Sequence, residues 1–405
     1  MRPADAYDAF LLDLDGVLFR GTEAIPGAAD AVAALRRRGR VVFLTNNSAR
    51  TPAQVAEKLR GMGFEAAPED VMTSALAAAR LVADEVRADG RDATAFVIGE
   101  DGIRTALRDA GVEVVDGDPE RAGFVVVAWD RGATYDRIRT ASVLARAGAR
   151  LVATNADATY PAPGGELWPG AGALLASVET ASGSRATVVG KPEPGLFEAA
   201  VERAGTRRAL VVGDRVETDL AGARAVGLDA ALVFSGAAVP ADLLDVDVEP
   251  VAAMADLRGL LDDAPLGPAR PGRPEQRDAV RALLDRSGLD PGEAAGDLTG
   301  TAVLGDPPAA TATVEVRDGQ GYLRSVAVDR EVRGRFRGVL VVASAVRRAV
   351  GAGAGTVYLL TETAAGFFER LGFVPMERPE LPAWIRERST ACPESAVAMR
   401  RPVRR

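Results

Sequence analysis

The chain has 405 residues, a hydrophobic fraction of 47% and a formal net charge of -8. This length favours two or three domains, and the negative charge argues against a general binder of nucleic acid or anionic membranes. The sequence contains no histidine and one cysteine. Ser-His-Asp triads, Cys-His dyads, histidine-ligated zinc and an internal disulfide framework are therefore excluded.

The cysteine content and the lack of long apolar stretches bear on the location of the protein in the cell. A single cysteine, Cys392, fits a reducing cytoplasm. The first eight residues are short and polar, and no apolar stretch approaches the ~18 residues that a membrane span requires. We expect a cytoplasmic protein without a signal peptide or membrane span.

The first part of the chain alternates short apolar runs with amphipathic segments, which is typical of a parallel sheet with crossover helices. The predicted strands are Ala9–Asp13, Arg40–Thr45, Ala186–Val189, Ala209–Val212 and Ala230–Phe234. The predicted helices are Ala28–Arg38, Pro52–Met62, Pro194–Arg203 and Thr218–Ala225.

A second pattern of strands interrupts the first. Its predicted strands are Ala95–Ile98, Gly123–Ala128 and Arg150–Ala153. Because the chemical motifs lie on both sides of this stretch and not within it, we interpret it as an inserted module. We therefore predict a core from residues 1–75 and 186–262, with residues 76–185 as an inserted α/β cap.

The stretch Asp262–Pro274 is dense in proline and glycine, which favours a linker; we place the linker at 263–274. A further globular pattern occupies residues 275–405 and indicates a C-terminal α+β domain. Its predicted strands are Ala310–Val316, Tyr322–Val328 and Thr356–Thr361. Its predicted helices are Gln276–Arg286, Val339–Val350 and Ala364–Leu371.

Four short polar segments are candidates for one cleft, and we expect each at the carboxyl end of a strand, where ligand sites of open parallel sheets lie. They are Asp13 with Asp15, Thr45 to Ser48, Gly190 to Pro192, and Gly213-Asp214 with Asp219. Two aspartates and a third from another strand make a hard oxygen site suited to Mg²⁺. A lysine and a threonine hydroxyl suit phosphate oxygens. Each segment alone also fits a turn or a helix cap, but their combination favours function.

These segments resemble the four motifs of the haloacid dehalogenase (HAD) superfamily. The similar stretches are DLDGVL at Asp13–Leu18, LTNNS at Leu44–Ser48, GKPEP at Gly190–Pro194 and GDRVETD at Gly213–Asp219. The closest resemblance is to the branch containing p-nitrophenylphosphatase, phosphoglycolate phosphatase and pyridoxal phosphatase. That branch carries a large α/β cap between its second and third motifs. The resemblance covers roughly residues 5 to 260, and Thr154–Asp157 and Pro169–Gly172 are similar to its return from cap to core.

The resemblance implies a mechanism. Asp13 would attack phosphorus and form an aspartyl-phosphate, while Asp15 would act as general acid and then general base. Mg²⁺ would be held by Asp13, the backbone carbonyl of Asp15, and Asp214. The resemblance assigns Thr45, Asn46 and Lys191 to the phosphoryl oxygens, and supporting roles to Gly16, Asn47 and Asp219.

The sequence indicates a small phosphorylated metabolite as substrate, but it does not identify which one. Asp130-Arg131 and Asn155 with Asp157 are candidates for lining the pocket, with surface salt bridges or caps as the alternative interpretation. Glucosyl-sized, nucleotide and three-carbon phosphates all fit. The family also implies a possible homodimer through the cap.

The C-terminal module resembles GNAT N-acetyltransferases, through residues 322–328, 333–338, 367–373 and 392–396. In that fold an R-x-x-G-x-G loop binds the pyrophosphate of acetyl-CoA. Here Phe336 stands at the middle glycine and Phe368 stands where many members have a catalytic tyrosine. These departures argue against acetyl-CoA binding.

Three functions follow for the whole chain: a phosphatase with a vestigial tail, a bifunctional phosphatase and acetyltransferase, or a phosphatase gated by a ligand of the tail. The fusion itself resembles actinobacterial glycerol-3-phosphate phosphatases. That resemblance makes glycerol 3-phosphate the leading substrate and 2-phosphoglycolate the next.

Overall fold

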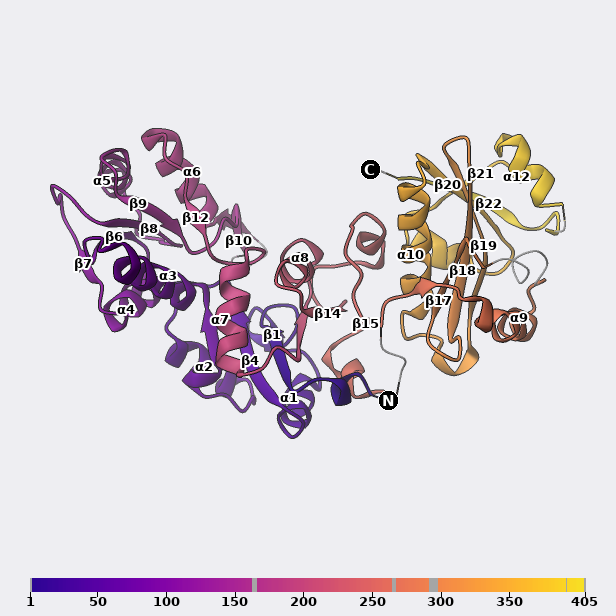
Figure 1. Ribbon diagram of the computed structural model, residues 1–405, viewed down its shortest axis with the longest axis horizontal. Helices are drawn as coiled ribbons and strands as arrows, with labels where there is room; N and C mark the ends of the chain where they lie inside the picture. The colour runs from indigo at the N-terminus through magenta and orange to yellow at the C-terminus, as the bar shows by residue number, and fades with distance from the viewer. Residues whose placement is uncertain (1, 162–165, 264–266, 291–297, 391, 404–405) are drawn as a thin grey trace. The chain divides into compact units, whose positions relative to one another are not determined.

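The computed structural model describes residues 2–161, 166–263, 267–290, 298–390 and 392–403, and Figure 1 traces the order of its elements. Residues 264–266 of the predicted linker lie outside the described residues. The described chain divides into two compact units, one of residues 7–213 and 217–229, the other of residues 1–6, 214–216 and 230–405.

The first sheet has the strand order β15-β14-β13-β1-β4-β5. Its strands are β1 (Ala9–Asp13), β4 (Arg40–Thr45), β5 (Val71–Thr73), β13 (Ala209–Gly213), β14 (Asp229–Val233) and β15 (Ala252–Met254). β1 pairs in parallel with both β4 and β13. Residues 9–12 of β1 are completely buried, because a central parallel strand is covered on both faces, which explains the unbroken apolar run. The predicted parallel sheet is confirmed.

The helices of this part follow the sequence pattern closely. They are α1 (Ala28–Arg36), α2 (Pro52–Gly61), α7 (Pro194–Ala204) and α8 (Ala221–Ala225), with the short strands β2 (Phe19–Arg20) and β3 (Glu23–Ala24) pairing after β1. α2 begins at a capping box, in which the Thr51 hydroxyl accepts from the Gln54 amide and the Gln54 side chain accepts from the Thr51 amide. This cap ends the loop after β4 and starts a helix directly beside it.

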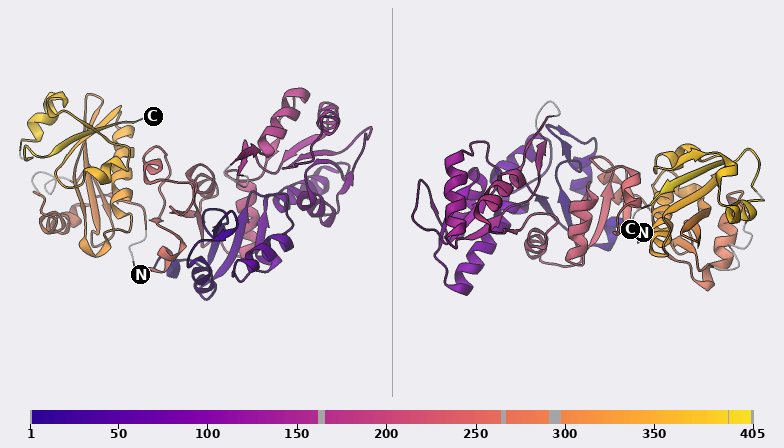
Figure 2. Two further views of the ribbon diagram at one scale, coloured as in Figure 1. Left: turned by 180° about the vertical axis from the view of Figure 1, so that it is seen from behind. Right: turned by 90° about the horizontal axis from the view of Figure 1, so that it is seen from above.

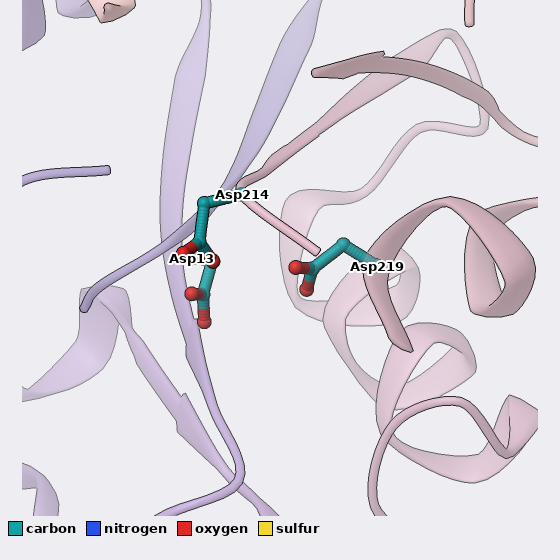
Figure 3. A group of neighbouring side chains, drawn as sticks. All are labelled: Asp13, Asp214 and Asp219. Atoms are coloured by element: carbon teal, nitrogen blue, oxygen red, sulfur yellow. The ribbon is translucent and has the colours of Figure 1, made fainter. Parts of the chain in front are cut away.

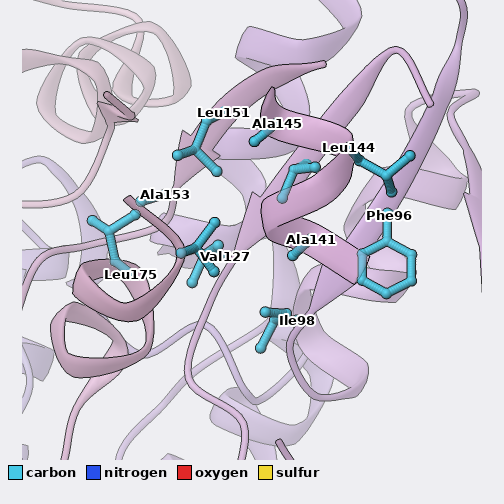
Figure 4. Close-up of a cluster of buried hydrophobic side chains, with 11 residues drawn as sticks. Phe96, Ile98, Val127, Ala141, Leu144, Ala145, Leu151, Ala153 and Leu175 are labelled. Atoms are coloured by element: carbon cyan, nitrogen blue, oxygen red, sulfur yellow. The ribbon is translucent and has the colours of Figure 1, made fainter. Parts of the chain in front are cut away.

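A second sheet has the strand order β12-β9-β8-β6-β7. Its strands are β6 (Thr94–Ile98), β7 (Glu113–Val115), β8 (Phe124–Val127), β9 (Arg150–Ala153) and β12 (Thr187–Val188). The helices between them are α3 (Ser74–Asp89), α4 (Asp101–Asp109), α5 (Tyr135–Arg146) and α6 (Ala171–Ser182); the hairpin of β10 (Thr159–Pro161) and β11 (Leu167–Pro169) precedes α6. Figure 4 shows the core of this module, where Phe96, Leu144 and Leu175 are buried. Each such side chain contributes about 1.5–3 kcal/mol by burial.

Two expectations for the return from this module are wrong. The strand predicted at Ala186–Val189 is β12, and it pairs with β9 in the second sheet rather than joining the first. The chain leaves the second sheet only after Val188, so Gly190 and Lys191 do not follow a strand of the first sheet. The helix predicted over Thr218–Ala225 is a π-helical turn, Val216–Leu220, followed by α8.

The C-terminal sheet has the order β16-β17-β18-β19-β20-β22-β21. Its strands are β16 (Arg270–Pro271), β17 (Thr301–Leu304), β18 (Ala310–Arg317), β19 (Gln320–Val328), β20 (Thr356–Thr361), β21 (Val374–Met376) and β22 (Val397–Pro402). The helices are α9 (Arg277–Arg286), α10 (Arg337–Gly351), α11 (Ala365–Glu369) and α12 (Ala383–Arg388). The described pairings are antiparallel except for β19 with β20. Figures 1 and 2 show α10 lying along this sheet, as the predicted α+β domain requires.

Within the described residues, every helix is too short or too polar to cross a membrane.

Candidate active site

Carboxylates from separate parts of the sequence gather where β1 and β13 end. Asp13 is the last residue of β1, Asp214 directly follows β13, and Asp219 lies in the π-helical turn. Carboxylate oxygens, one from each, all lie within 4.8 Å of one another. Figure 3 shows the three carboxyl groups turned toward one another. The predicted convergence of these aspartates is therefore present in the structure.

Lys191 joins this cluster. Its Nζ lies 2.5 Å from Asp13 Oδ1 and 2.6 Å from Asp219 Oδ1. The lysine side chain is 6% exposed and that of Asp219 is 1% exposed. Burial lowers the pKa of Lys191, but the charges and hydrogen bonds of Asp13 and Asp219 outweigh burial and hold that pKa above its usual range. Lys191 is therefore an ammonium at neutral pH.

The charge balance of the cluster favours a divalent cation. Three carboxylates and one ammonium carry a formal charge of minus two, and such charge is costly in a buried site unless it is compensated. Carboxylate oxygens are the ligands that Mg²⁺ prefers. The residues present therefore fit a Mg²⁺ ion held by Asp13 and Asp214, with Asp219 beside them. The Asp15 side chain is not part of the cluster; its predicted contribution is its main-chain carbonyl.

Two glycines leave the space that the cluster occupies. A Cβ atom on Gly213 would lie 2.2 Å from the Cβ of Asp219, and one on Gly236 would lie 1.9 Å from Asp214 Oδ2. The Ala237 amide donates to Asp214 Oδ2 at 2.7 Å. Sequence reasoning found Gly213 through its motif but missed Gly236 and Ala237, which lie in a stretch of small residues without a recognisable pattern.

Asp15 lies in a tight turn after β1. Gly16 has a φ of 81°, a conformation that glycine adopts without the strain of a side chain. The Gly16 amide donates to the Phe19 carbonyl at 2.7 Å. This turn leaves Asp15 exposed; the supporting role of Gly16 stays a prediction.

The loop after β4 holds its own shape. The Thr45 hydroxyl accepts from the Asn47 amide at 3.1 Å, and the Asn47 side chain accepts from the Ala49 amide at 3.0 Å. The sequence predicts that Asn46 orients phosphoryl oxygens. Its side chain contacts the Lys191 main chain, accepting from the Lys191 N–H at 2.8 Å and donating to the Lys191 carbonyl at 3.1 Å.

The predicted pocket residues of the inserted module behave differently from one another. Asp130 closes a loop, because its carboxylate accepts from the amides of Gly99 and Gly132. Asp157 accepts from the Asn46 side chain at 3.2 Å, and Asn155 donates to the Asn46 carbonyl at 2.9 Å. For Asp130 the structure thus supports the alternative interpretation, a loop cap.

A cavity of about 520 Å³ opens beside this loop. It is lined by Ala49, Arg50, Gln54, Glu57, Lys58, Glu100, Asp101 and Arg131. Arg131 forms an ion pair with Glu100 at 2.8 Å. The sequence predicted Arg131 as a pocket residue, and the other lining residues were missed. Gln54, Glu57 and Lys58 could have been found, because they lie on α2, an amphipathic helix that starts directly after the loop.

Lys58 is one of the cations that line this cavity. Its Nζ lies 3.7 Å from the centre of the Phe19 ring, a cation–π contact. Burial lowers the pKa of Lys58 and Arg50 lowers it further, while Asp15 opposes both. No ion pair between described residues includes Lys58.

The two phenylalanines that depart from the acetyltransferase pattern have clear places. Phe336 has a φ of 55°, a left-handed conformation that costs a side-chain residue roughly 1–2 kcal/mol. Its ring lies 4.6 Å from that of Phe234. Phe368 is buried against Phe367 and Phe373, as a core residue without a hydroxyl.

Comparisons with known families match both parts of the chain. The haloacid dehalogenase-like hydrolase model matches residues 10–113, and a HAD hydrolase-like model matches residues 188–260. The acetyltransferase (GNAT) family model matches residues 261–373.

Curated relatives match the first part. The chain is 36% identical over 254 residues to the acid sugar phosphatase of Staphylococcus haemolyticus, covering 62% of this chain and 94% of that protein. It is 37% identical over 254 residues to the 5'-nucleotidase YutF of Bacillus subtilis, covering 62% of this chain and 96% of that protein.

A solved structure matches nearly the whole chain. The glycerol phosphate phosphatase Rv1692 from Mycobacterium tuberculosis, in complex with magnesium, aligns with a TM-score of 0.73 and 29% identity. The alignment covers 92% of this chain and 98% of that one.

Proposed function

We propose that this chain hydrolyses small phosphate esters with Mg²⁺ through an aspartyl-phosphate. The chain belongs to the haloacid dehalogenase-like hydrolase family and is a phosphoric monoester hydrolase. The observation that carries the proposal is the cluster of Asp13, Asp214 and Asp219 with the ammonium of Lys191. A nucleophilic carboxylate needs to be ionised and held in place, and the lysine provides both conditions.

The residues then divide the reaction between them. A carboxylate oxygen of Asp13 attacks phosphorus, and the bond from phosphorus to the ester oxygen breaks. Asp15 gives its proton to the leaving alcohol and later takes one from the water that attacks the aspartyl-phosphate. Water attack returns Asp13 and releases inorganic phosphate.

The phosphoryl charge requires several cationic and polar partners. When bound, Mg²⁺ neutralises phosphoryl oxygens. Lys191 keeps Asp13 as a carboxylate and adds a positive charge next to it, and Thr45 offers a hydroxyl from the neighbouring strand end. Preorganised groups of this kind supply most of the rate enhancement in phosphoryl transfer.

Glycerol 3-phosphate is the substrate that we favour, followed by 2-phosphoglycolate. The support is the likeness to a glycerol phosphate phosphatase across both parts of the chain, together with the modest volume, about 520 Å³, of the cavity that Lys58 lines. The names of the curated relatives keep sugar phosphates and nucleotides in the test.

The test is phosphate release by the full chain from glycerol 3-phosphate, 2-phosphoglycolate, p-nitrophenyl phosphate, glucose 6-phosphate and a nucleoside 5'-monophosphate. We expect activity that EDTA abolishes and Mg²⁺ restores, with glycerol 3-phosphate giving the largest kcat/KM. Asp13→Asn should lower kcat by at least about 10³-fold while the thermal melt stays unchanged. Full activity of the folded variant would contradict the aspartyl-phosphate route.

Acetyl-CoA-dependent transfer is the second candidate function, because the GNAT family model matches the C-terminal part. The left-handed Phe336 and the buried Phe368 argue against it. A thermal shift and calorimetric heat with acetyl-CoA would support this candidate, and their absence would remove it. A shift accompanied by a change in phosphatase rate would favour gating by a ligand of the tail.

A further inference from the structure

Three segments that are distant in the sequence meet at the Asn46 side chain. Its Oδ1 accepts from the Lys191 N–H at 2.8 Å, and its Nδ2 donates to the Lys191 carbonyl at 3.1 Å. The same Nδ2 donates to Asp157 Oδ2 at 3.2 Å. One amide therefore bonds both main-chain polar groups of Lys191 and also a residue of the segment between β9 and β10.

The segment carrying Asp157 is itself fixed against Asn46. Asn155 donates to the Asn46 carbonyl at 2.9 Å, and Ser74 donates to the same oxygen at 2.7 Å. The Asn155 side chain also accepts from the Asp157 amide at 3.1 Å. These bonds orient the Asp157 carboxylate toward Asn46.

The junction leaves no room for a side chain at Gly190. A Cβ atom there would lie 2.4 Å from the Thr154 carbonyl oxygen and 2.7 Å from Asn46 Oδ1. The backbone before Lys191 is therefore packed directly on the two segments that hold it. A shift of either segment would move the lysine main chain.

The other end of Lys191 faces the reacting groups. Its ammonium bonds Asp13 at 2.5 Å and Asp219 at 2.6 Å. A nucleophile displaced by about 1 Å loses roughly 10²-fold in rate. The hydrogen bonds at the Lys191 main chain are thus coupled, through one side chain, to the carboxylate that attacks phosphorus.

We infer that Asn46 is a positioning residue through which Asp157 of the inserted module sets the position of Lys191. This inference rests on the proposed function of Asp13 and Lys191 in phosphoryl transfer. Neither Asn46 nor Asp157 touches the substrate in this scheme, so a variant of either residue acts on every phosphate ester alike.

The competing explanation is that Asp157 lines the pocket and contacts the leaving group. The two explanations differ in their dependence on substrate. A contact with the leaving group changes KM for some esters and not for others. A contact that acts through Lys191 lowers kcat by the same factor for all of them.

The first experiment compares Asp157→Ala and Asp157→Asn in the full chain, with p-nitrophenyl phosphate and glycerol 3-phosphate. Asp157→Ala should lower kcat about 10-fold on both esters with KM unchanged, since one hydrogen bond is lost. Asp157→Asn should restore the rate, because its amide oxygen accepts the same bond. Asp118→Ala is the matched control: the Asp118 carboxylate likewise accepts hydrogen bonds from side chains of the module, those of Arg139 and Thr140, and kcat should be unchanged.

The second experiment is a double-mutant cycle. Asn46→Ala should lower kcat about 100-fold, and Asp157→Ala added to it should have no further effect. The inference would be overturned if the double variant lowered kcat by the product of the two single effects, or if KM changed for one ester only. If Asn46→Ala does not fold, the comparison of Asp157→Ala with Asp157→Asn decides. If the wild-type chain with Mg²⁺ showed no phosphatase activity on any ester, the proposed function itself would be overturned.

Discussion

At the scale of single residues, the site shows how one lysine is kept charged in a buried place. Lys191 is almost fully enclosed, and its pKa is nevertheless raised because Asp13 and Asp219 lie within hydrogen-bond distance. The stabilisation from a raised lysine pKa is complete at neutral pH and is lost only as the pH rises through that pKa. Alkali, by removing the proton from the Lys191 ammonium, should therefore release it from its partners.

Lys58 should bind negative charge on the leaving group, because its ammonium faces the cavity over the Phe19 ring. Lys58→Met should lower kcat/KM for 2-phosphoglycolate about 10-fold, the effect of roughly 1.4 kcal/mol, and leave p-nitrophenyl phosphate unchanged. The pKa of Lys58 is below its usual range. As the pH rises, the preference for the anionic ester should therefore fall at a lower pH than it would with a lysine of ordinary pKa.

Arg121→Gln is the control for the Lys58 variant. It removes the same charge from an exposed position of the inserted module that does not line the cavity. Equal losses in both variants would show an effect of net charge and contradict a role for Lys58.

Gly236 should control metal affinity, since a Cβ atom there would lie 1.9 Å from Asp214 Oδ2. Gly236→Ala should displace the Asp214 carboxylate and raise the Mg²⁺ concentration for half-maximal activity 10- to 100-fold, the range typical of outer-shell changes. The measurement is activity against Mg²⁺ concentration. Gly61→Ala is the matched control, because no atom lies within 4 Å of its Cβ position; an unchanged Mg²⁺ dependence in both variants would contradict the role.

At the scale of elements, α10 begins with a buried charge. Arg337 is 4% exposed, and its Nε and one terminal nitrogen have no hydrogen-bond partner. Burial, together with the charge of Arg335, lowers the pKa of Arg337 to about 10. A buried charge without partners costs stability, so the start of α10 is held by the apolar face of the helix rather than by Arg337.

Arg337→Met should therefore raise the free energy of unfolding by roughly 1–3 kcal/mol at pH 7. The sign follows from the lowered pKa: the penalty is fully present below about pH 10 and fades only at higher pH. Chemical denaturation monitored by circular dichroism measures the change. Arg317→Met, at an exposed arginine of the same domain, should change little, and a destabilised Arg337 variant would contradict the interpretation.

At the scale of the whole molecule, the last strands of the phosphatase part and the acetyltransferase-like domain belong to one compact unit. Arg347 of α10 donates to the Leu243 carbonyl at 2.9 Å and pairs with Glu249 at 2.6 Å. Arg401 of β22 pairs with Asp245 at 2.6 Å. The C-terminal domain is therefore part of what holds residues 230–263 in place.

Arg347→Met should lower the melting temperature by several degrees, because a partly buried, hydrogen-bonded ion pair and the bond to the Leu243 carbonyl are broken. The temperature at which phosphatase activity is lost should fall together with the melting temperature of the whole chain. Arg317→Met again serves as the control for charge. A melt in which phosphatase activity persists after the C-terminal domain unfolds would contradict this coupling.

Much of the molecule follows from local sequence. The buried runs at β1, β4 and β13 and the amphipathic helices between them dictate a parallel sheet, and Asp13, Thr45 and Asp214 then lie at strand ends by topology alone. Short strands such as β5 and β15 were not predicted, because three residues carry too little periodicity to distinguish a strand from a loop.

By itself, the sequence determined that the chemistry is carried by oxygen ligands and a lysine, since it lacks histidine and places its acids after apolar strands. Only the tertiary structure decided how Lys191 reaches Asp13: it arrives from the second sheet and is held by Asn46. It also decided that Lys58 and Arg50 meet Glu100 and Arg131 across a cavity. Such contacts join segments separated by tens of residues, and their register depends on packing that no local pattern encodes.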